Sequence, residues 1–170
     1  MHSSGFHAVM DIKKSTRHEK ICGDFGEALV LYWLSKHGFE CARIDHTGID
    51  LIAVNPHTNE RMGISVKSRT RLVGKEKETV TLQASDFRAS EAACQAFECN
   101  PYFAIVVDAG KTIRVFIVSA SRVKEYYPTT AAGSYWKMSQ PFILKYANDD
   151  QIMAFEFQTT QGNWWKSISN

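Results

Sequence analysis

The segment GISVKSR, residues 63–69, combines the pattern of a buried β-strand with two polar side chains that point the same way. Side chains two apart on a strand share a face, so Ser65 and Lys67 lie together, opposite Ile64 and Val66. A lysine directed toward the interior of a protein needs an anionic partner or a chemical task. The acidic residues that other elements bring near this lysine decide whether it has a structural partner or a chemical role.

Two acidic residues also fall in apolar surroundings, where a covered carboxylate is costly unless it meets a cation. Asp50 interrupts an otherwise apolar strand, and Glu27 belongs to a predicted helix over residues 19–37. One stripe of that helix combines Glu27 with apolar residues, and the opposite stripe is apolar too: Ile21, Phe25, Ala28, Leu29 and Tyr32. A helix that is apolar nearly all round is expected to be buried.

A hairpin around the turn NPHTNE brings Asp50 and the lysine together. If the pairing is symmetric, Val54 lies opposite Arg61, and Asp50 then falls opposite Ser65 with Lys67 as its diagonal neighbour. A bulge would shift this register by one residue. In the symmetric register, Asp50, Ser65 and Lys67 share one face of the hairpin.

The remaining pattern supplies the elements around this hairpin. Helices are predicted over residues 19–37, 85–98 (with Ser85 as its N-cap) and 121–126, and strands over 41–44, 49–54, 62–67, 102–107, 112–118, 142–146 and 152–157. The order helix, three strands, helix, two strands and further additions predicts a mixed α/β sheet with helices packed on it.

Length and composition favour a single domain over residues 1–170, with a core at about 19–118 and an extension at about 119–170. The apolar run 102–107, like every other apolar run in the sequence, is too short to cross a bilayer. Residues 1–15 lack a signal-peptide pattern, so a soluble cytoplasmic protein without membrane contact is expected. The four cysteines form no CxxC pair, which favours reduced and mostly buried thiols, and the single pair His37 and Cys41 is explained better by a helix end than by zinc.

Three motifs in order resemble those of the PD-(D/E)XK nuclease superfamily, in the form found in restriction endonucleases and archaeal Holliday junction resolvases: GDFGE (23–27), GIDLIA (48–53) and ISVKSR (64–69). The resemblance extends over roughly residues 25–118. It implies a restriction-endonuclease-like α/β fold, with a mixed sheet flanked by helices and the core order αβββαββ.

The resemblance also implies a metal-dependent endonuclease acting on DNA. Asp50 matches the aspartate that binds Mg²⁺ (or Mn²⁺), Glu27 the first-helix glutamate that supports the metal, and Lys67 the lysine that orients the attacking water. Magnesium takes oxygen ligands and keeps several waters, so one or two carboxylates suffice. No small-molecule cofactor is implied. Such nucleases often pair as homodimers, although nothing in this sequence fixes the oligomeric state.

One position departs from the family pattern, which usually has an acid or glutamine where this chain has Ser65. Some restriction-enzyme relatives carry serine there and take the acid from the next helix, where Glu91 and Asp86 are candidates. Asp86 also has a local reason for its place, because an acid in the first turn of a helix is favourable.

Contacts to nucleic acid are expected from the basic residues after the strand, although the net charge of only +2 indicates no particular partner. The expected phosphate contacts are Arg69, Arg71, Lys75 and Lys77. The alternative for the whole chain is a non-catalytic module that kept the fold and binds nucleic acid or protein, with Lys67 and Glu27 as a structural ion pair. An unrelated enzyme has little support, because the sequence lacks a glycine-rich phosphate loop, a nucleophile elbow and zinc spacing.

Overall fold

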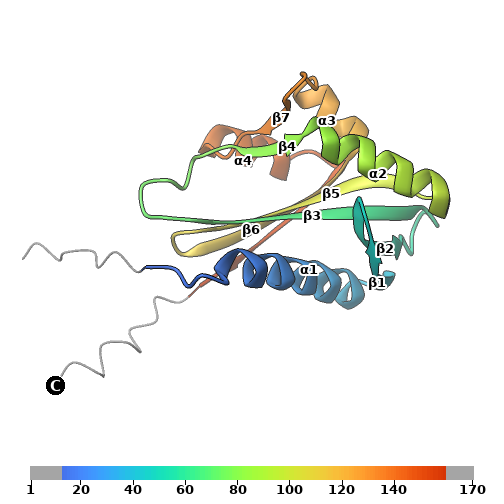
Figure 1. The fold of residues 1–170 in the computed structure, drawn as a ribbon, viewed down its shortest axis with the longest axis horizontal. Coiled ribbons are helices and arrows are strands. Elements are labelled where there is room, and N and C mark those ends of the chain that lie inside the picture. The colour runs from blue at the N-terminus through green and yellow to red at the C-terminus, as the bar shows by residue number, and fades with distance from the viewer. Residues whose placement is uncertain (1–12, 160–170) are drawn as a thin grey trace, which may run out of the picture.

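The computed structural model describes residues 13–159 of the chain, which form four helices and eight strands within that range (Figure 1). The elements are α1 (His18–Lys36), β1 (Glu40–His46), β2 (Ile49–Val54), β3 (Arg61–Arg71), β4 (Val80–Gln83), α2 (Ala84–Phe97), β5 (Asn100–Ala109), β6 (Thr112–Ser119), α3 (Ala120–Tyr126), β7 (Gly133–Trp136), α4 (Gln140–Ala147) and β8 (Ile152–Gln158).

Six strands form the main sheet in the order β1-β2-β3-β5-β6-β8, while β4 and β7 pair separately. The central pair, β3 with β5, is parallel, and the other neighbours in the main sheet are antiparallel. A parallel pair needs a crossover connection, and here β4 and α2 provide it. The sheet is therefore mixed, as the element pattern predicts.

The two faces of the sheet carry different layers (Figure 1). Helix α1 covers one face, where Val30 and Leu34 pack with Leu51 and Ile64 in one apolar cluster. The other face carries α2, α3, α4 and the small β4–β7 sheet around a larger cluster that includes Trp136. The expected core order αβββαββ is confirmed by α1, β1–β3, α2, β5 and β6, with β4 added before α2.

The segment 142–146, predicted as a strand, is instead part of α4. Ser139 precedes the helix as its N-cap, and Pro141 occupies its first turn, where proline is well tolerated. The apolar run of this segment is too short to separate strand from helix by its period. Helix α2 begins two residues earlier than the sequence predicts: Gln83 is its N-cap, and Ser85 lies inside the first turn.

Helix α1 is not buried all round, contrary to the prediction from its apolar pattern. The side chains of Ile21, Phe25 and Tyr32 are 52%, 44% and 55% exposed, while Val30 and Leu34 are fully buried. The helix covers the sheet with one face only, and no other described element covers its outer stripe. The predicted C-terminal cap is present, since Gly38 adopts a φ of +84° just after the helix.

Other features fell outside the predicted elements. Strand β3 continues to Arg71, so Arg69 and Arg71 lie on the strand rather than in a loop. The strands β4 and β7 are too short for a clear alternation and were not predicted. All four cysteines are free, but only Cys94 is buried, which corrects the expectation of mostly buried thiols. No helix between residues 13 and 159 is both long and apolar enough to cross a membrane.

Candidate active site

The hairpin of β2 and β3 places Asp50 where the two strands separate. The predicted pairing of Val54 with Arg61 is present, and the ladder continues to Leu51 opposite Ile64. One residue beyond, a carboxylate oxygen of Asp50 accepts the backbone N–H of Val66 at 2.6 Å. The side chain therefore satisfies the N–H that the departing strand leaves free, and its carboxylate lies beside β3 at Val66, the residue before Lys67.

Glu27 reaches the same region from helix α1. Glu27, Asp50 and Arg43 line one cavity of about 410 Å³ together with Asp45 and His46. Burial raises the pKa of Glu27, and the charge of Asp50 raises it further, against the lowering effect of Arg43. Two carboxylates from separate elements thus share a cavity in which their charges repel each other.

A close approach of α1 to β3 sets the position of Glu27. At Gly26 an added Cβ would lie 1.8 Å from the hydroxyl oxygen of Ser68 and 3.4 Å from a methyl carbon of Val66. Only glycine allows this separation, although glycine is unfavourable inside a helix. The residue that follows, Glu27, is therefore held near the strand that carries Lys67.

Lys67 finds its partner on helix α2 rather than on α1. Its amino group lies 2.9 Å from a carboxylate oxygen of Asp86, and both side chains are about one-fifth exposed, at 22% and 23%. The other oxygen of Asp86 accepts the backbone N–H of Gln83 at 2.8 Å, which fixes the acid at the start of α2. Glu27 instead pairs with Arg43 at 3.0 Å. The alternative ion pair between Lys67 and Glu27 is not formed.

The two other candidates at this site are placed differently. Ser65 is buried, with 4% of its surface exposed. Glu91, although on the same helix as Asp86, pairs with Lys124 of α3 at 2.7 Å and does not line the cavity of Glu27 and Asp50. Of the two acids considered on the second helix, Asp86 is the one that contacts Lys67. Between residues 13 and 159, no group of three His, Cys, Asp or Glu side chains could hold a metal ion by itself.

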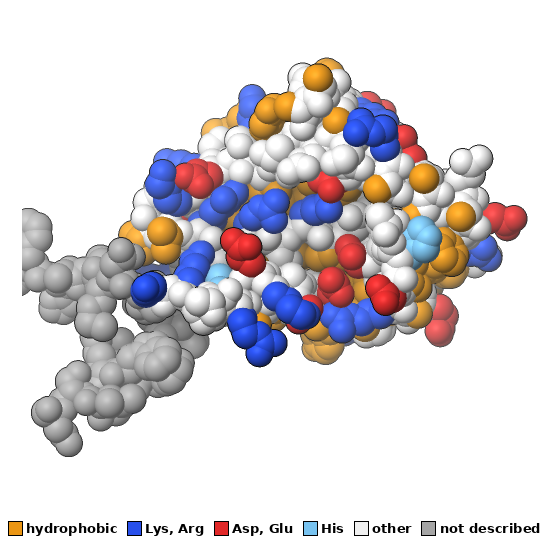
Figure 2. Space-filling model, viewed as in Figure 1, with side chains coloured by type: hydrophobic (Ala, Val, Ile, Leu, Met, Phe, Trp, Pro, Cys, Tyr) orange, Lys and Arg blue, Asp and Glu red, His pale blue; other side chains and the backbone are white. Residues whose placement is uncertain are grey.

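Within the described part of the chain, some of the basic residues after Lys67 form ion pairs with acidic side chains, and others do not. Arg71 and Lys75 both contact Glu78, at 3.4 and 2.9 Å, and Arg71 also donates to the carbonyl of Thr79 at 2.7 Å. Arg69 donates to the carbonyl of Ser68 at 2.8 Å. Figure 2 shows a row of Lys and Arg side chains across the middle of this face, with acidic side chains gathered below it.

Arg43 and Asp86 are the two residues whose importance the sequence pattern understates. Arg43 lies on a half-exposed edge strand, and nothing in its neighbourhood along the chain indicates that it contacts Glu27. The position of Asp86 in a first helical turn predicts a local role, which it has, and its second role with Lys67 depends on how α2 packs against β3.

No protein-family model matches the sequence, and no curated protein matches it. The chain is similar in structure to a Holliday junction resolvase of Archaeoglobus fulgidus, with 17% identity and a TM-score of 0.49 over 71% of this chain and 90% of the resolvase chain. It is also similar to a restriction endonuclease in complex with substrate DNA, with 14% identity and a TM-score of 0.40 over 86% of this chain and 73% of the endonuclease chain.

Proposed function

We propose that this protein is a metal-dependent endonuclease that hydrolyses phosphodiester bonds of DNA. Asp50 and Glu27 would hold a Mg²⁺ or Mn²⁺ ion, and Lys67 would position the attacking water. The observation that carries the proposal is the convergence of two carboxylates, from α1 and β2, on one cavity beside the strand that presents Lys67. In this proposal Ser65 replaces the acid that the family pattern usually has at this position, and the site works without that charge.

The donor set fits a hard cation that keeps water ligands. Only one of the two oxygens of Asp50 accepts the N–H of Val66, so the other is available. Burial and the repulsion from Asp50 together raise the pKa of Glu27, and a bound cation would relieve that repulsion. Two carboxylates with water suit Mg²⁺, whereas a structural zinc ion needs four protein ligands.

Each residue of the proposed site has a defined role. The N–H of Val66 holds Asp50 in one orientation, and the tight packing at Gly26 holds Glu27 opposite it. Asp86 anchors the amino group of Lys67, which can donate hydrogen bonds to a water or to a phosphate oxygen on which negative charge develops. A bound divalent ion supplies charge neutralisation and lowers the pKa of a coordinated water.

Cleavage of labelled plasmid, linear duplex and four-way-junction DNA in Mg²⁺ or Mn²⁺ tests the proposal. Asp50→Asn should reduce cutting by at least ~100-fold, the scale of losing one main electrostatic group of an active site. Glu91→Gln should cut at the wild-type rate, because Glu91 is engaged with Lys124. Cutting that survives Asp50→Asn would refute the site. The DNA form that is cut fastest would identify the substrate.

The second candidate is a non-catalytic module that binds nucleic acid or protein. The observation in its favour is that Lys67 and Glu27 each already have a partner of opposite charge, Asp86 and Arg43. A module of this kind needs no divalent ion. DNA binding that is indifferent to Mg²⁺, without cutting of any of the three DNA forms, would select this candidate over the nuclease.

A further inference from the structure

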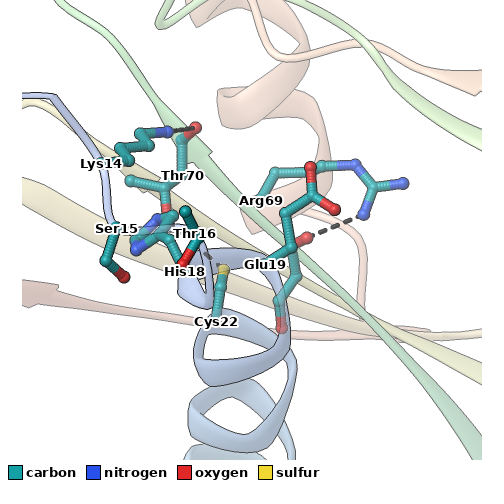
Figure 3. A pocket seen from close by; sticks show the side chains of 9 residues that line it. Lys14, Ser15, Thr16, His18, Glu19, Cys22, Arg69 and Thr70 are labelled. Carbon is teal, nitrogen blue, oxygen red and sulfur yellow. Dashed lines mark hydrogen bonds between the residues drawn. The ribbon is translucent and has the colours of Figure 1, made fainter.

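A second hollow lies on the same strand as Lys67, at the N-terminal end of α1. Its volume is about 550 Å³, and the side chains that matter here are Lys14, His18, Glu19, Arg69 and Thr70 (Figure 3). We call it the α1–β3 pocket. It shares Glu19, Ser68 and Arg69 with the cavity that contains Lys67 and Asp86, so the two hollows adjoin along β3.

Among the described residues, the cations of this pocket are not held in ion pairs, although the charge of Lys14 opposes the effect of burial, which raises the pKa of Asp108. Lys14 donates to the carbonyl oxygen of Thr70 at 3.0 Å, and Arg69 donates to the carbonyl oxygen of Ser68 at 2.8 Å. Within residues 13–159 neither side chain forms an ion pair, in contrast to Arg71 and Lys75, which share Glu78. A guanidinium has five N–H donors, so Arg69 keeps most of its capacity for an anion.

The side chain of Thr70 on β3 holds the polar groups of α1 in this pocket in place. The hydroxyl of Thr70 lies 3.2 Å from Nε2 of His18 and 3.4 Å from the sulfur of Cys22, which ties α1 to the end of β3. In Figure 3 the head groups of Lys14 and Arg69 lie on opposite sides of the pocket, with the carboxylate of Glu19 on the Arg69 side. The two cations therefore suit two separate anionic groups.

We propose that the α1–β3 pocket holds two backbone phosphates of the DNA strand that passes through the active site, one on Lys14 and one on Arg69. This inference rests on the proposed function for the identity of the ligand. Val66, which holds Asp50, and Thr70 are four residues apart on β3, or ~13 Å at ~3.3 Å per residue. A DNA duplex advances about 3.4 Å per nucleotide along its axis, so the phosphates in the pocket and those at the cleaved bond belong to one short stretch of the same strand.

The salt dependence of DNA binding measures these contacts directly. Binding of a fluorescent duplex is followed by anisotropy at several NaCl concentrations, in EDTA, with Asp50→Asn as the parent so that no cutting interferes. Each phosphate contact contributes about 0.9 to the slope of log K against log salt concentration, so Lys14→Ala and Arg69→Ala should each reduce the slope by about 0.9, and together by about 1.8.

Lys36→Ala is the matched control, since Lys36 is an exposed lysine at the other end of the same helix. It should leave the slope unchanged. Glu19→Gln should tighten binding by about two- to five-fold, because it removes one exposed like charge from the path of the phosphates. Both substituted cations are exposed, and circular dichroism of each variant confirms that it is folded.

Slopes of Lys14→Ala and Arg69→Ala that equal the parent value would overturn the inference, as would an equal loss in Lys36→Ala. A preference for 5′-phosphorylated over unphosphorylated oligonucleotides of the same length would also overturn it, because that result assigns the pocket to a terminal phosphate. These outcomes are separate from the test of the nuclease. Metal-dependent cutting with unchanged slopes would refute only the pocket, and reduced slopes without cutting would refute only the nuclease.

Discussion

Gly26→Ala is the substitution that tests most directly how the site is assembled. An added Cβ would lie 1.8 Å from the hydroxyl oxygen of Ser68 and 3.1 Å from its Cβ, so the hydroxyl must rotate away and the strand must give by a few tenths of an ångström. Overpacking of this kind costs about 1–3 kcal/mol, whereas replacing a glycine inside a helix by alanine contributes about 1 kcal/mol of stability. The balance predicts a net loss of about 1 kcal/mol in the free energy of unfolding.

Urea denaturation of four variants in EDTA measures this balance. Gly23→Ala is the matched control, because Gly23 lies on the same helix and its added Cβ would have nothing within 4 Å. It should gain about 1 kcal/mol. Adding Ser68→Ala to Gly26→Ala should recover part of the loss, and Ser68→Ala alone should cost little, since that hydroxyl is buried without a hydrogen-bond partner among the described residues.

The rate of DNA cleavage by Gly26→Ala should fall even under conditions where the protein remains folded, because Glu27 moves with the helix. The reasoning would be refuted if Gly26→Ala were as much more stable than wild type as Gly23→Ala, which is the result that helix propensity alone predicts. It would also be refuted if Ser68→Ala recovered nothing, since the contact would then lie elsewhere.

Two further predictions follow from titratable groups. Burial and the charge of Asp50 raise the pKa of Glu27 above its ordinary value, so the folded state holds this proton to a higher pH than the unfolded chain does. The folded state therefore loses stability as the pH rises through the raised pKa. Without metal, Glu27→Gln should therefore have a higher melting temperature than wild type at pH 7 but not near pH 4. Mg²⁺ should raise the melting temperature of wild type more than that of the variant. Equal shifts in melting temperature would argue against Glu27 as a metal ligand. For Asp149, burial raises the pKa, but hydrogen bonds from Tyr126, from the N–H of Gln151 and from Arg122 outweigh burial, so the pKa is lowered. The stability that this acid contributes is present above its unfolded pKa and is lost as the pH falls through the lowered value. Asp149→Asn should therefore cost about 1–3 kcal/mol at pH 7 in thermal unfolding, and a cost that does not shrink as the pH falls would contradict the assignment.

The parts of the fold that local pattern predicts are those in which one interaction dominates. The register of the β2–β3 hairpin follows from a turn of six residues and from the alternation of apolar side chains, and both give the pairing of Val54 with Arg61. The same register brings Asp50 to the strand of Lys67. Helix α1 and its end at Gly38 follow from periodicity and from a residue suited to positive φ.

The parts that were missed depend on packing between distant segments. The run at residues 142–146 becomes helical because Tyr146 is buried against Trp136 and Phe116, which no local pattern contains. The exposure of Phe25 and Tyr32 depends on how much of the sheet α1 covers. At the site, an ion pair between Glu27 and Lys67 was the alternative interpretation. Their partners are instead Arg43 and Asp86, because the edge strand and α2 meet the hairpin from different sides.

The parallel pairing of β3 with β5 has a consequence for the order in which the protein becomes competent during synthesis. The residues of the proposed site lie between Glu27 and Asp86, yet β3 has its longest pairing, ten residues from Met62 to Arg71, with a strand that ends at Ala109. An isolated hairpin is marginally stable at best in water. A ribosome must therefore release some twenty residues beyond Asp86 before Asp50 and Lys67 have a rigid support. The nascent chain carries every chemical group of the site well before it can use them.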